Sequence, residues 1–130
     1  MDNHIPLISG ALEAVITSPE YNEKILETFF APNYHQRVNG IELDYTQFVA
    51  HLSQLRQLTT AMELNILAIA QQEDKVLTHH LVDVSKKNGG HVLTEVFASF
   101  TVDHGLIIGC QELTRLIEGQ AEDTYLGSVR

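Results

Sequence analysis

One acidic residue, Glu112, falls in the middle of a run whose alternation predicts an otherwise apolar strand face. In the segment 106–116 every second residue shares that face, and the neighbours of Glu112 on it are Cys110 and Thr114. A carboxylate on such a surface needs a partner, a proton or a ligand, because removing its charge from water is costly. Apolar walls would raise its pKa and make it a general base or acid. Glu112 is therefore the first catalytic candidate. The alternative is a structural carboxylate held by a helix residue or by water.

The preceding segment predicts the opposite wall of a pocket around Glu112. Alternation through 91–102 places Val92, Thr94, Val96, Ala98, Phe100 and Val102 on one face. Residues 103–105 read as a three-residue hairpin loop, which would pair Val96 with Glu112 and put Leu106 and Ile108 on the pocket side. We expect Val96, Ala98, Phe100, Cys110 and Thr114 to bind a ligand there. The alternative for Cys110 is a purely structural role as a small buried core residue.

A histidine pair supplies the second candidate for chemistry. His79 and His80 are adjacent in a predicted strand, so they face opposite sides of the sheet and only one can line the pocket. A two-residue turn at Asn88-Gly89 would place His79 on the Glu112 face, and we take His79 as the catalytic partner. A slip of one residue would transfer this role to His80 as a pocket residue.

Two further polar residues open the first predicted strand. Tyr34 or His35 would face inward as a ligand-binding residue, or both would lie at a solvated strand end. Glu95 and Arg115 share the other face of the sheet, nearly diagonal across a hairpin, and we expect a surface or interface ion pair there.

Other classes of function find little support in the composition. A formal net charge of -9 disfavours nucleic acid and anionic membrane surfaces as partners. No pattern shows metal-ligand spacing or a phosphate-binding glycine loop, so we expect neither a metal nor a cofactor. No signal peptide or membrane span is recognisable, and we expect a cytoplasmic protein.

The elements that must position these residues follow from periodicity. A first helix begins at Pro6, and a second begins at Ser18-Pro19-Glu20, carries Phe29 and Phe30 on its buried stripe and ends at Ala31-Pro32. A hairpin turns at Asn39-Gly40, and a capping box of Asp44 and Gln47 starts a third helix with Phe48 and Leu52 on its buried stripe. Four long strands follow at 61–71, 75–85, 91–102 and 106–117, joined by short links, before a polar tail at 118–130. The pattern predicts one α+β domain over 1–130, a cone-like curved antiparallel sheet packed against three N-terminal helices.

The order of elements resembles the nuclear transport factor 2-like superfamily, and within it the SnoaL-like domains. Three segments carry the resemblance: Phe29 to Tyr34, Val102 to Ile107, and Glu112 to Gly119. It implies a cone with an internal cavity, and a homodimer formed through the outer face of the sheet, which we expect to carry Phe97, Ile107 and Leu113.

The resemblance also frames the expected function without naming it, because this fold serves many chemistries. We expect a pocket for a small apolar molecule and proton-transfer chemistry of the isomerase, cyclase or dehydratase type. The alternatives are a non-catalytic binding or accessory domain and an adaptor that uses the outer face of the sheet.

Overall fold

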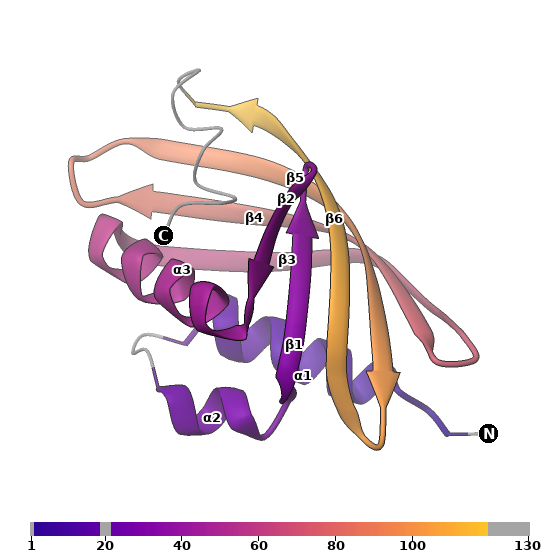
Figure 1. The fold of residues 1–130 in the computed structure, drawn as a ribbon. Coiled ribbons are helices and arrows are strands. Elements are labelled where there is room, and N and C mark those ends of the chain that lie inside the picture. Colours follow the sequence, from indigo (N-terminus) through magenta and orange to yellow (C-terminus); the bar gives the residue numbers. More distant parts are fainter. Residues whose placement is uncertain (1, 19–21, 120–130) are drawn as a thin grey trace.

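The computed structural model describes residues 2–18 and 22–119 and shows helices packed on one face of a curved, six-stranded sheet (Figure 1). Its elements are α1 (Ile5–Ile16), α2 (Glu23–Glu27), β1 (Phe30–Val38), β2 (Ile41–Asp44), α3 (Tyr45–Leu58), β3 (Thr59–Gln72), β4 (Lys75–Lys86), β5 (His91–Asp103) and β6 (Leu106–Glu118). The predicted α+β cone with three helices is confirmed. None of the described helices is both long and apolar enough to cross a membrane.

The sheet has the order β2-β1-β6-β5-β4-β3. The four long strands pair antiparallel, as their short links require. β1 instead pairs parallel with β6, so the sheet is mixed. A parallel pair needs a long connection, and the chain between β1 and β6 provides one.

The first and third helices begin and bury their stripes as expected. Pro6 stands in the first turn of α1, and Asp44 and Gln47 form the capping box that begins α3. Phe48 and Leu52 are buried on the inner side of α3. His51, on the same helix, is also buried, at 6% exposure.

The boundary between α2 and β1 differs from the prediction. The helix begins at Glu23, with the side chain of Asn22 accepting a hydrogen bond from the Lys24 backbone, while Pro19 and Glu20 lie outside the described residues. It ends at Glu27. Phe30, predicted to be helical, begins β1, because its extended backbone pairs with Ile107 of β6. This long-range pairing is invisible to local periodicity.

The β5–β6 hairpin turns one residue more tightly than predicted. His104 and Gly105 both have positive φ angles, and Asp103 pairs with Leu106, which leaves a two-residue turn. An irregularity between Thr101 and Val102 then restores the alternation of β6, but the predicted pairing of Val96 with Glu112 was wrong: Phe100 pairs with Cys110, Ala98 with Glu112 and Val96 with Thr114.

Because of that irregularity, the predicted inward-facing residues are right in one part of β6 and wrong in the other. Cys110, Glu112 and Thr114 share the inner side with their β5 partners, as the alternation predicted. The expected inward placement of Leu106 and Ile108 was wrong, because before the bulge it is Ile107 that faces the core, at 0% exposure. Ile107 is accordingly absent from the outer face.

The β4–β5 hairpin turns one residue more widely than predicted. The Lys86 N–H donates to the Gly90 carbonyl at 2.8 Å, so the loop is Lys87-Asn88-Gly89 with Gly89 at a φ of +90°. This register sets His80 opposite Val96, on the inner face, and His79 opposite Phe97, on the outer face. The two histidines therefore exchange the sides that the sequence assigned to them.

Candidate functional site

A cavity of about 140 Å³ lies between the inner face of the sheet and the helices α1 and α3. Its apolar walls are Leu12, Val15, Ile16, Phe48, Leu52, Leu55, Met62, Val82, Val84 and Val96. Its polar groups are Gln36, His51, His80, Thr94, Glu112 and Thr114. A mostly apolar pocket with a few polar groups is the usual composition of a small-molecule site.

Glu112 of β6 lines this cavity, on the side where strand alternation predicted it. Burial raises the pKa of its carboxyl group, because a charge there is poorly hydrated. The Cys110 thiol donates a long hydrogen bond of 3.5 Å to Oε2, which lowers the pKa slightly and offsets part of that rise. The pKa of Cys110 is itself raised, mainly by burial, so the thiol stays protonated and inert at neutral pH.

His80 of β4 is the histidine that reaches the cavity. It is 2% exposed, and its Nδ1 lies 3.0 Å from the Thr78 hydroxyl. Burial, aided by the neighbouring His79, lowers the pKa of His80 from 6.5 to about 4. The ring is therefore neutral at neutral pH, and its Nδ1 is already engaged.

The preference for His79 as the pocket histidine was wrong. Its Nε2 lies 2.7 Å from Glu95 on the outer face, and its ring stacks on Phe97 with centroids 4.1 Å apart. Arg115 donates from Nε to the same Glu95 at 3.0 Å, which is the ion pair that the hairpin diagonal predicted. Hydrogen bonds from His79 and then Arg115 lower the pKa of Glu95.

The first strand contributes a residue that the sequence analysis missed. Tyr34 is buried on the inner face, but it does not line the cavity; its hydroxyl donates to Gln36 Oε1 at 2.8 Å. Gln36, two residues on, does line it. The alternation that carried Tyr34 inward could have found Gln36 as well. His35 is exposed on the other side of the strand.

The remaining expected ligand-binding residues divide between cavity and core. Val96 and Thr114 line the cavity. Ala98, Phe100 and Cys110 are buried in the core beside it. His51 of α3 is buried and also lines the cavity.

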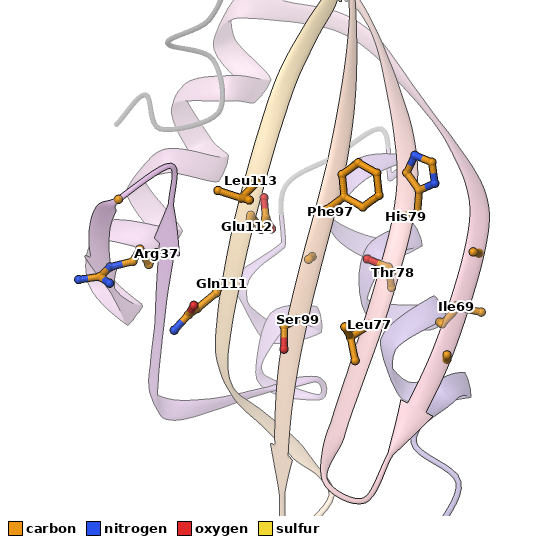
Figure 2. Close-up of a pocket in the computed structure, with 14 residues that line it drawn as sticks. Arg37, Ile69, Leu77, Thr78, His79, Phe97, Ser99, Gln111, Glu112 and Leu113 are labelled. Atoms are coloured by element: carbon orange, nitrogen blue, oxygen red, sulfur yellow. The ribbon is translucent and has the colours of Figure 1, made fainter.

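A second, larger hollow of about 510 Å³ occupies the outer face of the sheet (Figure 2). Leu77, His79, Phe97 and Leu113 project into it, and Phe97 and Leu113 are 50% and 69% exposed. Its lining is mostly apolar and open to solvent, and its one histidine is already engaged with Glu95. Glu112 borders this hollow too, but His80 lines only the inner cavity, so we assign the candidate site to the inner cavity, where the two titratable groups with shifted pKa values come together.

Among residues 2–18 and 22–119, no three His, Cys, Asp or Glu side chains come together in a way that could hold a metal ion.

Solved structures share this fold at low sequence identity. IdmH of Streptomyces antibioticus, a candidate polyketide cyclase, superposes with a TM-score of 0.74 at 14% identity, covering 87% of this chain and 92% of IdmH. An LEH-like epoxide hydrolase of M. tuberculosis gives 0.71 at 16% identity, covering 85% and 81%. A protein with a ketosteroid isomerase-like fold from Catenulispora acidiphila gives 0.69 at 13% identity, covering 83% and 84%.

The chain has the nuclear transport factor 2-like cone fold. The chain belongs to the same family as an uncharacterized protein of Schizosaccharomyces pombe, which is 32% identical over 105 residues, 81% of each chain. No family model matches the chain. Because this fold is shared by a candidate polyketide cyclase, an epoxide hydrolase and a protein with a ketosteroid isomerase-like fold, the fold alone does not name a reaction.

Proposed function

We propose that this SnoaL-like protein carries out proton-transfer chemistry, as an isomerase, cyclase or dehydratase, on a small, largely apolar substrate. The observation that carries the proposal is that Glu112 and His80 line the same cavity. Burial raises the pKa of Glu112 and lowers the pKa of His80. Groups whose environments push their pKa values in useful directions mark acid–base sites.

The strand pairing sets how far apart the two groups stand. His80 and Glu112 belong to β4 and β6, which flank β5 and are about 10 Å apart; the pairing sets His80 level with Thr114, two residues along β6 from Glu112. Side chains directed into the cavity from both strands leave room for a small molecule between them.

Each group has a definite role in the proposed reaction. Glu112, as carboxylate, accepts a proton from a carbon next to a substrate carbonyl, and the C–H electron pair moves into an enolate. With the Thr78 hydroxyl donating to Nδ1, neutral His80 carries its proton on Nε2 and donates a hydrogen bond to the enolate oxygen. Return of the proton to a different carbon yields an isomer; loss of a β-hydroxyl group, which takes the proton from Glu112 and leaves as water, yields a dehydrated product.

A binding or accessory domain without catalysis is the second candidate. The contact of Glu112 with the Cys110 thiol favours it, because a carboxylate with an internal partner need not serve a substrate. In that case Glu112→Gln should stabilise the fold above pH 4.5. The raised pKa means that ionising Glu112 costs stability as the pH rises, and the amide avoids this cost.

Isotope exchange separates the two candidates. We expect the protein to accelerate exchange of the α-protons of cyclohexanone for deuterium, followed by NMR, and Glu112→Gln to lower this rate by at least about 100-fold. Glu95→Gln is the matched control on the outer face and should leave the rate unchanged. Equal rates in the wild type and Glu112→Gln would exclude proton transfer by Glu112.

We further propose that a second copy of the chain packs on the outer face, forming a homodimer. Leu77, Phe97 and Leu113 are at least half exposed there; Phe97 pairs with Leu113 on the neighbouring strand, and Leu77 borders the same hollow from β4 (Figure 2). Contiguous exposed apolar surface of this kind is typical of interaction sites. Sedimentation at micromolar concentration tests this proposal, and a purely monomeric species would contradict it.

A further inference from the structure

We propose that the inner cavity selects neutral carbonyl compounds with one ring or a short chain, of about six to ten heavy atoms, and excludes fused-ring molecules. The inference rests on the proposed function for its choice of site. It can nevertheless be tested by binding alone, without turnover.

The size limit follows from the volume and from the rigidity of the walls. A cavity of about 150 Å³ holds a benzene-sized molecule, and this one measures about 140 Å³. Pockets for larger ligands start at about 300 Å³. Phe48 and Leu52 on the helix side are buried core residues, so they cannot recede without opening the core.

A guanidinium clamp fixes the helical side of the cavity. Arg56 of α3 donates from Nη2 to the carbonyls of Val15 at 3.0 Å and Ile16 at 3.3 Å, in the last turn of α1. Val15 and Ile16 are themselves cavity walls. The two helices are thereby joined beside the cavity, and these bonds resist the separation of the helices that a bulky ligand would require.

Charge complementarity sets the second limit. The lining contains one carboxylate, Glu112, and no lysine or arginine. An anionic ligand would therefore meet a like charge with no counter-ion in a poorly hydrated space. A cation could pair with Glu112, but it would lose its own hydration against ten apolar side chains. Neutral ligands avoid both costs.

The polar wall specifies a hydrogen-bond acceptor on the ligand. The amide oxygen of Gln36 already accepts from the Tyr34 hydroxyl, so the amide NH₂ is the group that Gln36 offers to the cavity. The Tyr34 ring packs against both Phe30 and Phe48, with centroids 4.8 Å from each. Tyr34 is thus a positioning residue for Gln36, and a ligand carbonyl is the matching acceptor.

A titration series on the full chain, followed by NMR chemical shifts, tests the size and charge limits together. Cyclohexanone should bind more tightly, by about tenfold or more, than methylcyclohexane, cyclohexanecarboxylate or cyclohexylammonium. The two-ring 2-decalone and a four-ring ketosteroid should not bind at the cavity. Equal or tighter binding of either fused-ring ketone, or of a charged analogue, would overturn the inference, as would the absence of binding by every compound in the series.

A pair of cavity variants provides the matched comparison. Leu55→Ala enlarges the wall and should admit 2-decalone, whereas Leu113→Ala on the outer face should leave the series unchanged. Melting curves check that both variants fold. Cyclohexanone binding without isotope exchange would sink the proposed catalysis and leave this inference standing. Isotope exchange catalysed on a ketosteroid would support the proposed catalysis and overturn the size limit of this inference.

Discussion

The two faces of the sheet treat the same residue types in opposite ways, and the adjacent His79 and His80 show this most directly. His79, on the outer face, is stacked on Phe97 and bonded to Glu95. His80, on the inner face, is 2% exposed, contacts Thr78 and has its pKa lowered to about 4. One residue along a strand separates a histidine tied into a surface ion-pair group from one kept neutral inside a cavity.

The carboxylates repeat this contrast. Glu95 on the outer face has its pKa lowered by hydrogen bonds from His79 and Arg115, so it stays ionised. Glu112 on the inner face has its pKa raised by burial. Environment, rather than residue type, therefore divides candidate chemistry from surface structure in this sheet.

The largest expected effect concerns the acid stability of the inner face. Unfolded His80 titrates near 6.5 and folded His80 near 4, so the unfolded state takes up the proton first and stability falls as the pH drops through this window. The total loss from this residue is about 3 kcal/mol. Urea unfolding from pH 4 to pH 7 measures how the unfolding free energy changes with pH. The contribution of His80 is the part of this slope that the His80→Gln variant lacks. His79→Gln should keep that slope; if it removed the slope instead, the assignment of the two faces would be reversed.

The second effect concerns the hydrogen bonds by which Asn39 holds the part of β6 that lines the cavity. Asn39, in the β1–β2 turn with φ 50°, donates from its side chain to Thr114 Oγ1 and accepts from the Thr114 N–H, at 2.7 and 2.8 Å. Its backbone N–H donates to the Glu112 carbonyl. Asn39→Ala loses the side-chain bonds and strains the turn, so we expect a loss of about 2 kcal/mol in unfolding free energy.

Asn39→Gly serves as the control for that change, because glycine tolerates the positive φ and loses only the side-chain bonds. It should cost about 1 kcal/mol. If the glycine variant proved as unstable as the alanine variant, strain in the turn would have no part in the effect.

A smaller effect is expected from the outer carboxylate. Glu95→Gln removes the negative charge and one of the two oxygens that accept from His79 and Arg115. Because the pKa of Glu95 is lowered, its stabilisation is present above pH 4.5 and disappears as the pH falls further. We expect the variant to be less stable than the wild type at pH 7 and equal to it in acid, by thermal unfolding. A difference that persisted in acid would point to packing against Phe97 instead.

The smallest effect on folding is expected at the proposed dimer face. Leu113 is 69% exposed, so Leu113→Asp should change the unfolding free energy of the monomer by no more than about 0.5 kcal/mol. Sedimentation should nonetheless show that the variant loses its dimer. A variant that remained dimeric would place the interface elsewhere.

Local patterns in the sequence determined the elements and much of the inner face. The alternation of β6 put Cys110, Glu112 and Thr114 on one side, and the short links between long strands required antiparallel pairing. The capping box of Asp44 and Gln47 marked the start of α3. These features depend on neighbours within a few residues, and such patterns can be read directly from the chain.

The tertiary structure alone decided the registers and everything that depends on them. The turn residues at Lys87-Asn88-Gly89 and His104-Gly105 do not show in the sequence whether a hairpin loop has two or three residues. The loop at Lys87-Asn88-Gly89 has three, and this one residue exchanges the sides of His79 and His80. The parallel pairing of β1 with β6 drew Phe30 out of the predicted helix and brought Gln36 to the cavity. Because a strand has a side-chain period of two residues, one residue of register decides which histidine can meet a substrate, and only the packed sheet sets that register.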